Sequence, residues 1–131
     1  MQQPTKTKQY YREDLIEYVS QYFGNFHTYE EMKDLLFACK LNDFINRHEI
    51  IYIYGTGNNA KRYRKMITKC DGYIVSDGYD KSTEWGEEAK YFSEIELNKS
   101  TGIIVCVYRA FRESIVKCLT NKGFSNYICI P

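Results

Sequence analysis

The sequence predicts an α/β fold, a parallel sheet of about five strands with helices on both faces, preceded by an N-terminal helical extension. Three observations support this expectation. The apolar run 50–54 ends at a glycine turn and continues as a helix-period pattern. Short apolar runs and helix-period segments then alternate, which favours parallel strands joined by right-handed crossovers. The run 102–108 is almost continuously apolar, as expected of a central strand buried on both faces.

Length and composition favour one domain and exclude several classes of partner. The 131 residues can bury a core without a metal or a disulfide. A net charge of +1, with 27% charged residues, provides no long-range field for nucleic acid. No apolar run reaches the roughly 18 residues of a membrane span, and the polar N-terminus lacks the apolar core of a signal peptide. We therefore expect a cytoplasmic protein that neither binds nucleic acid nor inserts into a membrane.

The cysteines and histidines predict free thiols and no metal site. The cysteines are odd in number and have no Cys-x-x-Cys spacing, so we expect buried free thiols in a reducing compartment. Neither His27 nor His48 belongs to a ligand-spaced cluster, and these are the only histidines. The five cysteines are Cys39, Cys70, Cys106, Cys118 and Cys129.

Three segments are expected along the chain. Residues 1–9 are polar and are expected to form a disordered lead, 10–47 a helical extension, and 48–131 a nucleotide-binding domain. In the extension, apolar residues recur at helical spacing from the start of the segment until Gly24. The apolar faces of these helices are candidates for contacts with a second copy or with a larger enzyme partner.

A second helix of the extension is expected to begin at Thr28. The Thr28 hydroxyl and the Glu31 carboxylate have the spacing of a capping box, in which each satisfies a backbone N–H group of the first turn. The apolar side of this helix would carry Met32, Leu35, Leu36 and Cys39.

The glycine turn is typical of the first βα turn of a Rossmann-like domain. Gly55 permits the tight turn, Gly57 lets backbone N–H groups approach a phosphate, and Ala60 allows the helix to pack closely on the strand. A phosphate placed there would face a helix N-terminus. A turn that uses glycine for geometry alone stays open as the alternative. The residues expected to hold a ligand diphosphate are Gly55, Thr56, Gly57, Asn58 and Asn59.

The remaining elements follow from periodicity. A helix is expected after the glycine turn, with an inward stripe of Ala60, Tyr63, Ile67 and Cys70. Further strands are expected at 73–75, 91–92, 102–108 and 127–130. The helix after the central strand is expected to carry Phe111, Ile115, Cys118 and Leu119 on its buried side.

Ligands of such sheets bind outside the carboxyl ends of the strands, at the point where the strand order reverses. Here that point lies between the strands 50–54 and 102–108. Asp77 follows Gly55 at the spacing of the acid that holds ribose hydroxyls, and Ser76 precedes it, so either side chain is a candidate for that contact. Asp77-Gly78 is also a common turn dipeptide, and that interpretation stays open.

Two arginines form a second candidate group. Arg109 and Arg112 fall in the first turn of the helix after the central strand, where positive side chains oppose the helix dipole. A bound phosphate or carboxylate would compensate them, and their spacing permits a bidentate clamp. An acidic side chain of the protein, such as Glu113, is the alternative partner. Tyr54, Tyr79 and Tyr108 are candidates to line a base or a sugar.

Part of the sequence resembles a known family. The residues are Ile-Tyr-Gly-Thr-Gly-Asn-Asn-Ala-Lys at 53–61, Gly-Tyr-Ile-Val-Ser-Asp at 72–77, and the ending from Arg112-Glu-Ser-Ile to Lys-Gly-Phe at 122–124. They resemble the small Rossmann-like domain of PglD-type sugar acyltransferases and related bacterial polysaccharide-biosynthesis enzymes. In the acyltransferases this domain binds the UDP-sugar at its glycine turn, and a left-handed β-helix carries acetyl-CoA. The positions matched in that pocket are Gly55, Gly57, Asn58, Asn59, Asp77 and Arg112.

The chain also departs from this family. Val107-Tyr108-Arg109 stands where the family has Gly-Asp-Asn, and no hexapeptide repeats follow. We therefore expect a cytoplasmic nucleotide or sugar-nucleotide binding module of a bacterial surface-polysaccharide pathway, without catalysis of its own. Two alternatives stay open: an NAD(P)-binding fragment of an oxidoreductase, and an assembly module with a degenerate site. The sequence does not identify the ligand; a UDP-sugar and NAD(P) are the candidates.

Overall fold

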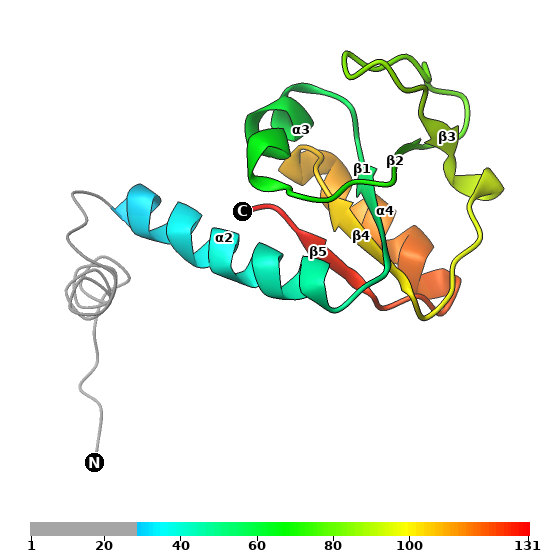
Figure 1. The fold of residues 1–131 in the computed structure, drawn as a ribbon. Coiled ribbons are helices and arrows are strands. Elements are labelled where there is room, and N and C mark those ends of the chain that lie inside the picture. Colours follow the sequence, from blue (N-terminus) through cyan, green and yellow to red (C-terminus); the bar gives the residue numbers. More distant parts are fainter. Residues whose placement is uncertain (1–28) are drawn as a thin grey trace. The chain divides into compact units, whose positions relative to one another are not determined.

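The computed structural model describes residues 29–131 (Figure 1). The expected lead 1–9, the first helix of the extension and Thr28 lie outside the described residues. Residues Cys39–Ile130 form one compact unit, and, of the described residues, 29–38 belong with Pro131 to another. The elements are α2 (Tyr29–Asn46), β1 (Ile50–Tyr54), α3 (Asn58–Tyr63), the 3-10 turn η1 (Arg64–Met66), β2 (Gly72–Val75), β3 (Lys90–Tyr91), the 3-10 turn η2 (Phe92–Glu94), β4 (Thr101–Val105), α4 (Arg109–Asn121) and β5 (Tyr127–Cys129).

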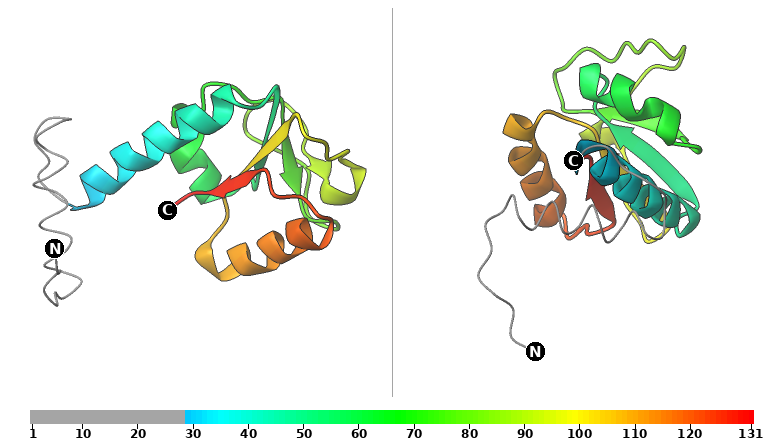
Figure 2. Two further views of the ribbon diagram at one scale, coloured as in Figure 1. Left: turned by 90° about the horizontal axis from the view of Figure 1, so that it is seen from below. Right: turned by 90° about the vertical axis from the view of Figure 1, so that its left-hand side faces the viewer.

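The five strands form one parallel sheet in the order β3-β2-β1-β4-β5. The chain runs from β1 outwards to β2 and β3 and then returns to the other side of β1 for β4 and β5. Right-handed crossovers in these two directions place α3 and α4 on opposite faces of the sheet (Figure 2). The predicted α/β class is therefore confirmed, and the strand order reverses between β1 and β4, as predicted.

One face of the sheet packs against α4. Successive strand residues point to opposite faces, so Tyr54 of β1 lies on the same side as Ile103 and Val105 of β4. These side chains are buried with Ile115 and Leu119 of α4. Burying a large apolar side chain stabilises a fold by about 1.5–3 kcal/mol, so this cluster fixes α4 on the sheet.

The other face is covered in part by the end of α2. A Cβ added at Gly102 would lie 2.8 Å from the Phe44 ring and 2.9 Å from the His48 ring. These two rings lie 4.4 Å apart, and His48 Nδ1 is 2.8 Å from the Phe44 carbonyl oxygen. The two rings thus pack directly against the backbone of β4 at Gly102, where no side chain intervenes.

The helix after the glycine turn is shorter than predicted. α3 ends at Tyr63, and after η1 the backbone of Ile67 is extended. The Arg64 guanidinium ends the helical run by donating to the Ile67 carbonyl at 2.9 Å and to the Tyr73 hydroxyl at 2.8 Å. Ala60 and Tyr63 are buried as predicted. The assignment of Ile67 and Cys70 to this helix was wrong.

Two further expectations need correction. The central strand ends at Val105, so residues 106–108 form a loop instead of continuing the strand. Cys106 is buried, whereas Cys39 and Cys118 are exposed, so the expectation of buried thiols was wrong for these two.

Among residues 29–131, no helix combines the length and the apolar character needed to cross a membrane.

Gly102→Ala is predicted to destabilise the fold by about 1–3 kcal/mol, because the added methyl group overlaps the rings of buried Phe44 and half-buried His48. Chemical denaturation of the single variants Gly102→Ala and Phe44→Leu and of the double variant measures the coupling. The Gly102→Ala penalty should be smaller in the Phe44→Leu background. Equal penalties in the two backgrounds would contradict the packing described.

Candidate functional site

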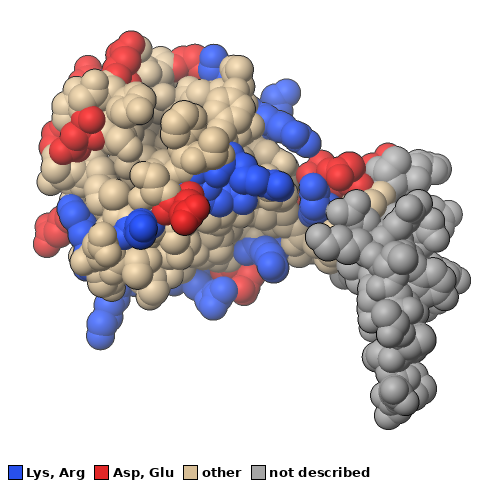
Figure 3. Space-filling model, turned by 180° about the vertical axis from the view of Figure 1, so that it is seen from behind, with Lys and Arg blue, Asp and Glu red and all other residues tan. Residues whose placement is uncertain are grey.

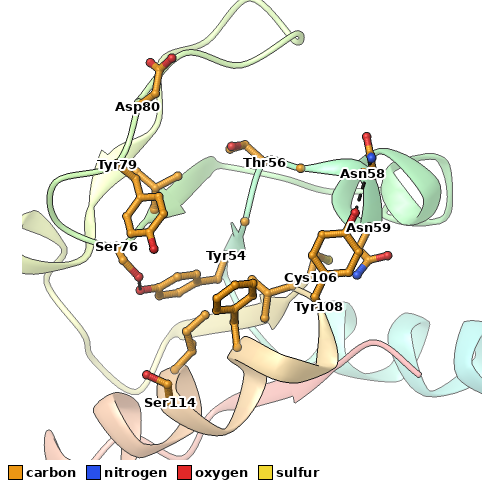
Figure 4. Close-up of a pocket in the computed structure, with 16 residues that line it drawn as sticks. Tyr54, Thr56, Asn58, Asn59, Ser76, Tyr79, Asp80, Cys106, Tyr108 and Ser114 are labelled. Carbon is orange, nitrogen blue, oxygen red and sulfur yellow. Dashed lines mark hydrogen bonds between the residues drawn. The ribbon is translucent and has the colours of Figure 1, made fainter.

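A pocket of about 410 Å³ opens where β1, β2 and β4 reach their carboxyl ends (Figure 4). Its volume falls in the range of small-molecule sites, and its position is the one expected for a doubly wound sheet. Three segments supply the walls: the glycine turn, the loop after β2, and the segment from the end of β4 into α4. The lining residues are Tyr54, Gly55, Thr56, Gly57, Asn58, Asn59, Val75, Ser76, Tyr79, Asp80, Cys106, Val107, Tyr108, Phe111, Ser114 and Ile115.

Gly55 sets the geometry of the pocket. Its φ of +111° is a conformation that L-residues rarely adopt, and a Cβ there would lie 2.5 Å from the Cys106 carbonyl oxygen. The Gly55 N–H donates to the Ile74 carbonyl at 2.9 Å, and the Cys106 N–H donates to the Tyr54 carbonyl at 2.8 Å. The tips of three strands are therefore held together at one residue that has no side chain.

Gly57 has a different role from Gly55. It is the N-cap residue of α3, its φ of −87° is open to any residue, and a Cβ there would meet nothing within 4 Å. The fold therefore does not require glycine at this position. Its missing side chain instead leaves room in the pocket beside the turn.

Aromatic side chains form most of the apolar wall. Tyr79, Tyr108 and Phe111 are the exposed large apolar side chains of the described chain, with exposed fractions of 63%, 52% and 56%, and all three line the pocket. Figure 4 shows Tyr79 and Tyr108 on opposite sides of Tyr54. Exposed apolar groups that gather at one concave site indicate a binding surface, because they lose contact with water when a ligand arrives.

The Tyr54 hydroxyl is tied to Ser76. Its oxygen lies 2.7 Å from Ser76 Oγ, and burial raises the pKa of Tyr54 above its ordinary value. The phenol therefore stays protonated at neutral pH. Burial likewise raises the pKa of Cys106 to about 12, so the only thiol of the pocket is not a nucleophile at neutral pH.

Ser76 and Asp77, the two candidates for a ribose contact, lie in different surroundings. Ser76 lines the pocket. Asp77 does not, because its carboxylate turns to the next segment and accepts a hydrogen bond of 3.2 Å from the Ser93 N–H. Asp80 is the acid that lines the pocket instead. Its pKa is lowered because the Ser82 N–H donates to Oδ1 at 2.9 Å, so Asp80 is ionised at neutral pH.

The two arginines occupy the first turn of α4 as predicted, but the structure does not bring them into the pocket. The helix presents Tyr108, Phe111 and Ile115 to it, a stripe at helical spacing, and Arg109 and Arg112 each follow a member of that stripe by one position. Arg112 instead lies close enough to Cys129 to oppose part of the rise that burial causes in the pKa of that thiol.

The structure thus gathers six of the nine predicted site residues, namely Gly55, Thr56, Gly57, Asn58, Asn59 and Ser76. Tyr54, Tyr79 and Tyr108 line the pocket, as predicted. Sequence reasoning missed Asp80 and Phe111. Phe111 was expected with Ile115 on the buried side of the helix, because apolar periodicity is the same for a core and for a pocket wall, but it is 56% exposed.

Charge on the surface of the protein is mixed on the face that Figure 3 shows. On the face seen from behind, Lys and Arg side chains are interspersed with Asp and Glu (Figure 3). Within residues 29–131, no group of three or more His, Cys, Asp or Glu side chains has the arrangement of a metal site. The chemistry of the pocket is therefore that of backbone amides, hydroxyl groups, aromatic rings and one carboxylate.

The two turn glycines are predicted to respond differently to the same substitution. Gly55→Ala should lower the free energy of unfolding by about 2–4 kcal/mol, since it combines a disfavoured φ with a backbone clash. Gly57→Ala should stay within about 1 kcal/mol of the unsubstituted chain, the range of N-cap changes. Urea denaturation of both variants is the measurement. Similar losses for the two would show that the turn is not built as described.

Comparison of the chain with protein-family models, with curated proteins and with solved structures finds no match in any of the three.

Proposed function

We propose that this domain is a binding module for a nucleotide or sugar nucleotide, with the ligand diphosphate at the 55–59 turn and a ring of the ligand against the aromatic wall. The observation that carries the proposal is a coincidence in space: the glycine turn and all three exposed aromatic side chains of the described chain meet in one pocket. The resemblance to sugar acyltransferase domains extends the proposal to a cytoplasmic step of bacterial polysaccharide biosynthesis.

Backbone groups would carry the phosphate contacts. No Lys or Arg of the described chain lines the pocket, so side-chain cations do not supply them there. The first N–H groups of a helix have no partner within it, and here they follow a residue without a side chain. Gly57 supports the proposal because the fold has no use for glycine there, whereas a phosphate approaching the turn does.

The aromatic wall suits a planar ring. Tyr79 comes from the loop after β2, whereas Tyr108 and Phe111 come from the start of α4, so a base between them would contact rings from two directions. Stacking of a base on an aromatic side chain contributes about 1–3 kcal/mol. This is enough to anchor the ring of a nucleotide whose phosphates face the turn.

Binding without reaction fits the lining better than catalysis. Among the described residues that line the pocket, the thiol and the Tyr54 phenol are both held protonated and Asp80 is the single carboxylate, so these residues form no acid–base pair or activated nucleophile. We therefore assign the module the role of holding a substrate or cofactor for a partner domain or enzyme.

A thermal-shift panel with UDP, UDP-N-acetylglucosamine, NAD, NADP and CoA tests the function. A ligand at about 100 times its dissociation constant should add roughly 2.7 kcal/mol of stability, or several degrees. Phe111→Ala should weaken binding about tenfold, because one stacking contact is lost. Lys117→Ala, an exposed position of α4 outside the pocket, is the control and should change nothing.

Gly57→Val provides the second arm of the same experiment, because it fills the space beside the turn while its φ is acceptable to valine. It should abolish the shift in a protein that still melts cooperatively. A response to NAD or NADP alone would favour the oxidoreductase alternative. No response to any of the ligands would overturn the proposed function.

A further inference from the structure

A tight turn places the exposed ring of Tyr79 beside the pocket. The Tyr79 N–H donates to the Ser76 carbonyl at 3.2 Å, which closes a turn of four residues directly after β2. Gly78, the third residue of this turn, has a φ of +91°, and only glycines have a positive φ among the described residues. These are the features of a type II β-turn, which requires glycine or asparagine at its third position. The position of Tyr79 therefore depends on Gly78.

The chain is anchored on both sides of Tyr79. Before the ring, the Asp77 carboxylate accepts a hydrogen bond of 3.2 Å from the Ser93 N–H. After the ring, the Lys81 carbonyl accepts a hydrogen bond of 2.8 Å from the Ala89 N–H. Both bonds reach the segment around β3, so the turn that carries Tyr79 has a defined place at the end of the sheet.

The Tyr79 ring serves the pocket more than the core. Its exposed fraction is 63%, so the fold gains little from burying it. The ring lines the pocket, and Figure 4 shows it beside Ser76 and Tyr54. Burial is the main cause of the raised pKa of Tyr54, and the Tyr79 phenol is near enough to add to it. A turn that requires glycine thus holds at the pocket a ring that the core does not need.

From this arrangement, and resting on the proposed function, we propose that Tyr79 gives the site its selectivity for ligands that carry a base, and that Gly78 is the positioning residue that holds its ring in place. The diphosphate lies at the 55–59 turn, and the base stacks on Tyr79. Stacking uses the flat face that every base has, so it serves a purine and a pyrimidine alike. A ligand with the same phosphates but no base gains nothing from this ring.

Calorimetric titration with UDP, ADP and inorganic pyrophosphate tests the selectivity, because pyrophosphate has the two phosphates without a base. Tyr79→Ala should weaken the binding of UDP and ADP about tenfold, the effect of losing one stacked ring, and should leave the affinity for pyrophosphate unchanged. Tyr79→Phe keeps the ring, so it should lose less affinity for the two nucleotides than Tyr79→Ala.

Gly78→Ala should also weaken the binding of UDP and ADP without changing that of pyrophosphate, because the disfavoured φ forces the turn to shift and moves the ring. Gly78→Asn should restore most of the affinity, since asparagine is accepted at this position of the turn. The matched control is Gly86→Ala. Gly86 lies in the same loop, has a φ of +81° and, like Gly78, has nothing within 4 Å of an added Cβ, but it lies outside the turn that carries Tyr79. Gly86→Ala should lower the stability and leave all three affinities unchanged.

The outcomes separate this inference from the proposed function. Nucleotide affinities that Tyr79→Ala leaves unchanged, an equal loss for pyrophosphate, or a loss in Gly86→Ala as large as in Gly78→Ala would overturn the inference and leave the binding module standing. Failure of both nucleotides to bind the unsubstituted protein would also overturn it, and the panel with UDP-N-acetylglucosamine, NAD, NADP and CoA then decides the proposed function separately.

Discussion

The pocket depends on one backbone constraint, the close approach of Gly55 to the carbonyl oxygen of Cys106 at a positive φ. Because Gly55 also donates to Ile74, the same residue joins the ends of β1, β2 and β4. The glycine turn, the loop after β2 and the start of α4 each begin at the end of one of these strands. The position of the strand ends therefore determines where the three segments meet. A side chain at this point would separate the strand tips and with them the three walls of the pocket.

Within the glycine turn, one glycine is needed by the fold and another is explained by the proposed ligand. Gly55 is glycine because the backbone requires it, whereas Gly57 is glycine at a position where the backbone would accept another residue. The stripe Tyr108, Phe111 and Ile115 shows a similar division along α4. Ile115 is buried in the core, whereas the two aromatic rings remain exposed at the pocket, so one helix face both packs on the sheet and forms a wall.

The fold was predictable from the sequence because its strongest signals are local. Four of the five strands follow apolar runs; the fifth, β3, was predicted at 91–92 and lies at Lys90–Tyr91, because Phe92 begins the turn η2. The glycine turn follows from residues that a tight βα turn needs. The end of α3 was not predictable, since it depends on the Arg64 side chain reaching Tyr73 on another element. The part of the site formed by the glycine turn, residues 55–59, was predictable from the sequence. The site was not predictable in the loop after β2, where the fold turns Asp77 towards Ser93 and makes Asp80 the acidic residue among those that line the pocket.

The most direct test of a ligand site at the glycine turn is a titration of the ¹⁵N-labelled protein with UDP-N-acetylglucosamine, followed by amide chemical shifts. The largest changes should fall in three separate segments, 55–59, 76–80 and 107–111, because these meet only around the pocket. The amides of β5 and of the far end of α4 should stay unchanged and serve as internal controls. Changes confined to one of the three segments, or centred on β5, would contradict a site built where the strand tips meet.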